Sequence, residues 1–128
     1  MTTVSLMPWL SVRRGAVALA FYKQAFDAVE LFLIQSDDGA VVAQLSIDGA
    51  IFWMSDESPE NKNFSPESLG GGTVKLVLTV PDPHTTFAKA VAVGASIVHE
   101  VVEEHGWLIG RVADPFGHHW EIGKQLEE

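Results

Sequence analysis

Apolar and polar residues alternate through much of this chain, and two stretches replace that alternation with a helical spacing. Alternation at every second position is typical of strands, whereas apolar residues three and four positions apart are typical of helices. In the first half we expect strands over 4–12, 29–35, 41–47 and 50–55, with a helix over 16–26. In the second half we expect strands over 73–80, 96–103, 107–113 and 118–124, with a helix from Pro81 to residue 93.

The two halves repeat each other. Sliding the chain by 68 residues places Leu10-Ser11-Val12 over Leu78-Thr79-Val80, and Asp48-Gly49-Ala50 over Phe116-Gly117-His118. A fixed internal offset is the sequence mark of a duplicated structural unit. We predict one α+β domain over 1–128, made of two βαβββ modules over 1–56 and 73–128. The polar segment 57–72 is expected to be a linker, with a flap over a site as the alternative.

Each predicted sheet has two different faces. After the turn Asp114-Pro115-Phe116-Gly117, the side chains of Trp120 and Ile122 share one face, and those of His119 and Glu121 share the other. The same division holds on the other strands, where one face is apolar and the other mixes aromatic, hydroxyl and charged groups. We therefore expect a curved mixed sheet around a concave pocket, with the helices on its outer face.

Composition narrows the possible partners. The chain has 128 residues, 47% of them hydrophobic, with no cysteine and a net charge of −9. The charge argues against binding to nucleic acid or to an anionic membrane, because both require clustered Lys and Arg. The N-terminal segment lacks the features of a signal peptide, so a cytoplasmic protein is the expectation.

Four motifs resemble the vicinal oxygen chelate superfamily, which includes glyoxalases, bleomycin-resistance proteins and extradiol dioxygenases, and its PhnB-like subgroup in particular. The motifs are Phe21-Tyr22-Lys23-Gln24-Ala25-Phe26, Ile47-Asp48-Gly49-Ala50, Val91-Ala92-Val93-Gly94-Ala95 and Asp114-Pro115-Phe116-Gly117-His118. The resemblance implies the fold but leaves the reaction open, because proteins of one fold carry out many functions.

Metal-using members of that superfamily place ligands on the first, fourth, fifth and eighth strands. The corresponding positions here are Met7, Trp53, Lys75 and Glu121, of which only Glu121 is a good ligand for a divalent ion. The resemblance therefore implies no metal or other cofactor in this chain. The alternative is a divalent metal held by Glu121 and His119, with His99 or His105 from a neighbouring strand or a dimer mate.

Lys75 and Glu121 are predicted to form an ion pair across the pocket. The pair either neutralises two buried charges or leaves Lys75 to hold an anionic or carbonyl-bearing ligand, and both readings stay open. Trp9 and Trp53 also face the pocket, with Trp107 as a further candidate, and parallel indoles could sandwich a flat aromatic ring.

These observations favour a metal-independent binding protein over an enzyme, one that sequesters an aromatic drug or natural product as a homodimer. The candidate ligand-binding residues are Met7, Trp9, Trp53, Lys75, Trp107 and Glu121. The alternative is a lyase, isomerase or dioxygenase with Glu121 as base and Lys75 or His119 as acid. A third possibility is a scaffold whose concave face is filled by its own side chains.

Overall fold

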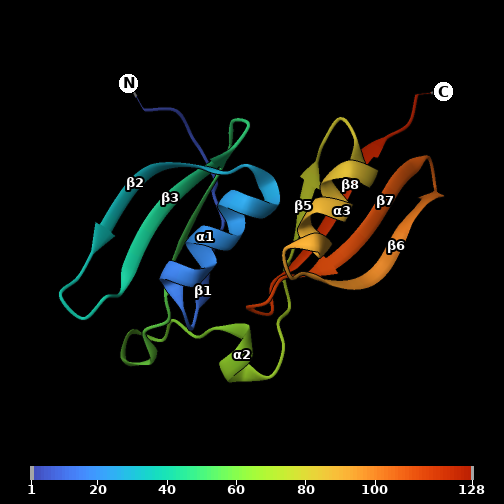
Figure 1. Ribbon diagram of the computed structural model, residues 1–128. Helices are drawn as coiled ribbons and strands as arrows, with labels where there is room; N and C mark the ends of the chain where they lie inside the picture. The colour runs from blue at the N-terminus through green and yellow to red at the C-terminus, as the bar shows by residue number, and fades with distance from the viewer. Residues whose placement is uncertain (1, 128) are drawn as a thin grey trace.

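The computed structural model describes residues 2–127 and contains two copies of the same βαβββ unit (Figure 1). The first copy comprises β1 (Trp9–Val12), α1 (Gly15–Phe26), β2 (Val29–Gln35), β3 (Val41–Ile47) and β4 (Ala50–Asp56). The second comprises β5 (Lys75–Thr79), α3 (Pro83–Ala92), β6 (Ser96–Glu104), β7 (Trp107–Ala113) and β8 (His119–Gln125). A short 3-10 turn, η1 (Pro59–Asn61), and α2 (Pro66–Leu69) lie between the copies.

Each copy forms its own four-stranded mixed sheet, with strand orders β1-β4-β3-β2 and β5-β8-β7-β6. The parallel pairs have equivalent registers, because Trp9 lies opposite Trp53 in the first sheet and Val77 lies opposite Glu121 in the second. Both partners differ by the offset of 68 found in the sequence. The α+β fold with two βαβββ modules is therefore confirmed, as two open sheets that do not close into a barrel.

Helices α1 and α3 lie together on one side of the sheets and contact each other (Figure 1). Proline at the start of α3 has no N–H to satisfy, and the side chain of Asp82 accepts a hydrogen bond from the Thr85 N–H at 3.3 Å. The start of α1 depends on the absence of a side chain. A Cβ on Gly15 would lie 2.2 Å from Asp56 Oδ1.

One hydrophobic core joins the halves. The Trp120 ring of β8 lies 4.7 Å from the Phe26 ring, 5.6 Å from the Tyr22 ring and 5.7 Å from the Phe52 ring, measured between centroids. All three partners belong to the first half. Trp120, Tyr22 and Phe26 are almost completely buried, so the helix-facing sides of the two sheets pack as a single interior.

A buried carboxylate adds polar contacts at the same junction. Asp114 accepts hydrogen bonds from the Tyr22 hydroxyl at 2.5 Å and from the Trp120 indole at 2.9 Å. Its other oxygen accepts from the backbone N–H groups of Phe116 and His118. Burial raises the pKa of Tyr22, and the negative charge of Asp114 raises it further, so the phenol remains a hydrogen-bond donor.

The expected start of the first strand was wrong. The first strand begins at Trp9 instead of residue 4, and the segment before it is exposed, with Val4 and Leu6 fully accessible. Pro8 has no N–H to donate to a sheet, but its carbonyl accepts a hydrogen bond from the Trp53 N–H at 2.9 Å.

The segment 57–72 is more structured than the linker we expected. Ser65 is fully buried and begins α2, where its side chain accepts a hydrogen bond from the Ser68 N–H. Glu57 holds the same turn by accepting from the Ser65 N–H and from the Ser68 hydroxyl. These contacts lower the pKa of Glu57 and fix the segment against the first half.

Among the helices of residues 2–127, none has the length and apolar character needed to cross a membrane.

Candidate functional site

The open face of the first sheet is aromatic. Trp9 and Trp53 lie on neighbouring parallel strands with ring centroids 5.2 Å apart and planes inclined by 12°. Phe32 of β2 meets the Trp53 ring edge-on at 5.8 Å. The Trp9 indole N–H donates to Ser55 Oγ at 2.9 Å, which fixes the orientation of the pair.

The predicted sandwich of a ligand between these indoles does not fit this geometry. A ring inserted between them would need about twice the usual separation of ~3.5–4.0 Å between stacked carbons. Neighbouring strands lie only ~4.8 Å apart, so same-face side chains at paired positions touch each other directly. A flat ligand can stack only on the outer surface of the indole pair, where Trp9 is 52% exposed.

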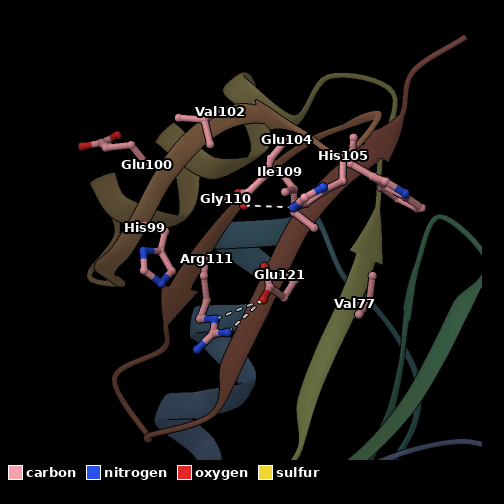
Figure 2. Close-up of a pocket in the computed structure, with 11 residues that line it drawn as sticks. Val77, His99, Glu100, Val102, Glu104, His105, Ile109, Gly110, Arg111 and Glu121 are labelled. Carbon is pink, nitrogen blue, oxygen red and sulfur yellow. Dashed lines mark hydrogen bonds and ion pairs between the residues drawn. The ribbon is translucent and has the colours of Figure 1, made fainter. Parts of the chain in front are cut away.

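The open face of the second sheet is charged. The Lys75 ammonium lies 3.1 Å from Glu121 Oε1, so the predicted ion pair is present. The Arg111 guanidinium donates to the same oxygen, from Nε at 3.2 Å and from Nη2 at 3.0 Å, as Figure 2 shows. The backbone register carries Val77, Glu121, Arg111 and His99 in one row across the sheet.

Arg111 was missed in the sequence analysis, although a signal for it existed. The turn after Asp114 makes β7 and β8 an antiparallel pair in which Ala113 lies opposite His119. Stepping two residues back and two forward places Arg111 opposite Glu121 on the same face. A predicted hairpin therefore already contained this contact.

Glu121 is an ionised carboxylate in this setting. Partial burial raises its pKa, but hydrogen bonds from Lys75 and Arg111, together with their positive charges, lower it by more, so the net shift is downward. A general base is most effective when its pKa lies near the working pH. The structure moves the pKa of Glu121 in the opposite direction.

Two of the cavities beside Lys75, Arg111 and Glu121 include Arg111. The larger, of about 700 Å³, lies on the open face of the second sheet, and Trp107, His99 and His105 are among its lining residues (Figure 2). The smaller, of about 300 Å³, lies between the halves and is lined in part by Trp9, Lys75 and His119. Arg111 lines both cavities, so the charged group, formed by Lys75, Arg111 and Glu121, separates them.

Met7 and several neighbouring residues lie farther from this group. Met7 lies in a separate crevice of about 500 Å³ that also includes Lys75, and its sulfur accepts a hydrogen bond from Gln44 Nε2 at 3.7 Å. His118 reaches the first half, where a ring nitrogen lies 2.9 Å from the Ser11 carbonyl oxygen. The segment 57–72 supplies Phe64, Pro66 and Leu69 to the wall of the smaller cavity.

The donor set does not fit a divalent metal. Within residues 2–127, no three His, Asp or Glu side chains come together in a geometry that could hold an ion. Two cationic side chains contact the one carboxylate available, and they would repel a metal ion approaching it. We therefore assign no chemical step to a metal.

Comparison with known proteins agrees with this fold. A profile described as a glyoxalase-like domain matches residues 10–123. The chain belongs to the glyoxalase-like domain family. An uncharacterized protein of Mycobacterium bovis, Mb0911c, is 41% identical to this family member over 130 residues, covering 97% of this chain and 85% of that protein.

Several solved structures superpose over nearly the whole chain of this family member. A gene product of Arabidopsis thaliana is 32% identical with a TM-score of 0.74, covering 96% of this chain and 100% of that one. The fosfomycin resistance protein FosX of Listeria monocytogenes is 13% identical with a TM-score of 0.74, covering 98% and 95%. The PhnB protein of Bacillus cereus is 20% identical with a TM-score of 0.70, covering 97% and 100%. The last two share the fold alone.

Proposed function

We propose that this protein binds a small aromatic molecule without a metal ion and sequesters it. The observation that carries the proposal is the contact of Lys75 and Arg111 with Glu121, at the position where metal-using members of the resembled superfamily hold their ion. The ammonium and guanidinium groups supply positive charge to a ligand directly.

The aromatic face of the first sheet supports the second part of the proposal. Stacked indoles present a flat apolar surface, and each aromatic pair contributes about 0.5–1.5 kcal/mol beyond its buried area. Exposed aromatic side chains gathered on one face are characteristic of sites that bind ligands or partners. Trp9 and Phe32 are exposed here, and the half-buried Trp53 contacts both of them.

Titration of tryptophan fluorescence with a panel of aromatic antibiotics and natural products, in the presence of EDTA, tests this function. We expect at least one compound to quench the emission of Trp9 and Trp53 saturably, with the same affinity before and after chelation. Trp9→Ala should reduce the response. Trp107→Phe is the comparison variant, because it changes a tryptophan outside the indole pair and keeps an aromatic ring there. Binding or catalysis that appears only after adding Ni²⁺, Zn²⁺, Mn²⁺ or Fe²⁺ would replace this proposal with a metal-dependent enzyme.

We also propose that two chains associate through β2. This edge strand exposes five apolar side chains, and an unpaired apolar edge favours pairing with another chain. The exposed apolar residues are Val29, Leu31, Phe32, Leu33 and Ile34. Light scattering coupled to size-exclusion chromatography should give twice the mass of one chain, and a monomer at high concentration would contradict the proposal.

A further inference from the structure

The smaller cavity, at the junction between the halves, has an unusual set of charges. Its polar lining includes the two cations Lys75 and Arg111 and the imidazoles of His118 and His119. Within the described part of the chain, none of its lining residues is an Asp or a Glu. In a chain with a net charge of −9, two cations in a cavity without a lining carboxylate need a local explanation.

The single carboxylate next to this cavity does not balance the two cations. Lys75 and Arg111 both contact Oε1 of Glu121, so one negative charge is shared between two positive ones. The group formed by Lys75, Arg111 and Glu121 therefore has a positive charge in excess. The Lys75 side chain is also 49% exposed, which leaves the ammonium accessible to a ligand.

The larger cavity on the other side of Arg111 differs in charge. Glu100, Glu104 and Glu121 are among its lining residues. An anion would therefore be repelled from the larger cavity and attracted to the smaller one, although the two are adjacent. We therefore expect a ligand with a negative end to place that end in the smaller cavity.

The walls of the junction cavity fit an aromatic ring beside that negative end. Trp9, which is 52% exposed, lines this cavity together with Phe64 and Leu69 of the segment 57–72. A volume of about 300 Å³ lies at the lower limit of small-molecule sites, which favours a compact ligand over a large drug.

We propose that the junction cavity binds small aromatic carboxylates, with the carboxylate between Lys75 and Arg111 and the ring against Trp9. This inference rests on the proposed binding function and names the class of ligand. Arginine suits the role because its planar guanidinium presents several N–H groups to a carboxylate at once. Its contacts with Glu121 use Nε and Nη2, and the group has five N–H donors in all.

Four probes measured by isothermal titration calorimetry separate the role of charge from the role of the ring. They are benzoate, benzamide, cyclohexanecarboxylate and cyclohexanecarboxamide. We expect benzoate to bind about tenfold more tightly than benzamide, because only the anion gains charge-assisted hydrogen bonds. Raising the salt concentration should weaken binding of the two acids and leave the two amides unaffected.

The outcomes distinguish this inference from the proposed function. Equal affinity for each acid and its amide, or no binding of either acid at millimolar concentration, would overturn the anion site. If benzamide still binds in that case, the aromatic function stands. If cyclohexanecarboxylate binds as tightly as benzoate, the anion site stands and the aromatic function fails.

Two substitutions with opposite expected effects test the residues themselves. Lys75→Met should weaken benzoate binding by about tenfold or more while leaving benzamide unchanged. Glu121→Gln removes the carboxylate that competes for both cations, so benzoate binding should become tighter. Lys62→Met removes the same charge from an exposed position outside the cavity and should change neither affinity. Weaker benzoate binding in Glu121→Gln would overturn the assignment.

Discussion

The two halves share one topology and one register, yet their open faces have opposite chemical character. Trp53 in the first sheet and Glu121 in the second occupy equivalent positions in the duplicated unit. The first is part of a neutral aromatic stack, and the second is the centre of a charged group. The backbone therefore fixes where side chains meet, and the residue at each meeting point decides what the surface can bind.

The helix-facing sides of the same sheets differ much less. Phe52 and Trp120, also related by the offset of 68, are both aromatic, both buried, and in contact with each other. Packing restricts those positions to large apolar groups, whereas the open faces carry no such restriction. The divergence between the halves is concentrated where ligands would bind.

The edge strands show a second contrast. β2 exposes a run of apolar side chains, whereas β6 carries His99, Glu100, Glu103 and Glu104. Charged side chains on an edge discourage pairing with another chain. Of these two edge strands, β2 is therefore the one that suits the proposed association.

The largest expected effect comes from replacing a residue on the side where the halves are alike. Trp120→Ala removes an indole packed against Tyr22, Phe26 and Phe52, and should lower the free energy of unfolding by about 3–5 kcal/mol. Urea unfolding followed by circular dichroism measures this loss. The matched substitution Trp9→Ala, on the open face, should cost much less. Equal losses would show that the two faces contribute equally to stability.

A change on the edge strands should have the next largest effect. Ile34→Lys places a charge on β2 and should raise the dimer dissociation constant at least tenfold, which corresponds to about 1.4 kcal/mol. Sedimentation equilibrium measures the constant. Ile97→Lys introduces the same change on β6, at a position of similar exposure, and should leave association unaffected. An equal effect of both substitutions would remove the contrast between the edges.

Placing a charged residue of the second open face at the equivalent position of the first should have a smaller effect, on ligand affinity. Trp53→Glu places on the first face the residue that the second face carries at the equivalent position. Loss of the stack with Trp9 should weaken aromatic ligands about two- to tenfold, in line with stacking energies of about 0.5–1.5 kcal/mol. Trp53→Phe retains a ring and should preserve most of the affinity. Fluorescence titration gives both values, and unchanged binding in Trp53→Glu would exclude this face.

The smallest effect concerns the pH dependence of the charged face. The pKa of Glu121 is lowered in the folded protein, so between that value and its ordinary value the unfolded chain binds more protons than the folded one. The stabilisation from Glu121 is therefore present above the ordinary pKa and is lost as the pH falls through the lowered one. We expect a loss of about 1 kcal/mol or less, because Lys75 is half exposed.

Urea unfolding from pH 7 to pH 3 tests this sign. Glu121→Gln has no carboxylate to titrate at this position, so its curve should fall less steeply in acid than that of the unchanged protein. Parallel curves for the two proteins would mean that Lys75 and Arg111 do not stabilise the carboxylate.

Much of the fold followed from the sequence because apolar alternation and the internal offset are local and periodic signals. The strands over 41–47 and 107–113 have the predicted bounds, and Lys75 meets Glu121 as predicted. The segment 57–72 was underestimated because its order depends on contacts with other parts of the chain. Arg13 hydrogen-bonds to Ser68, and Pro66 packs beside Gly117.

The site was harder to predict because its geometry depends on distances between neighbouring strands. Sequence placed Trp9 and Trp53 on one face but not their direct stacking, which excludes a ligand between them. Arg111 also belongs to the site only because β7 pairs with β8 and places it opposite Glu121. Ligand identity depends on such contacts, and periodicity alone does not encode them.

Asp114 makes the two copies of the repeated unit unequal in their dependence on each other. The equivalent residue of the first half, Ser46, makes only a local contact, accepting a hydrogen bond from the Gly49 N–H. Asp114 instead joins Tyr22 of one half to Trp120 of the other. The buried acid of the second copy thus depends on the first copy for one of its hydrogen-bond donors. Separating the two halves would leave the buried Asp114 without the Tyr22 hydroxyl and would expose the Trp120 ring that packs against Tyr22.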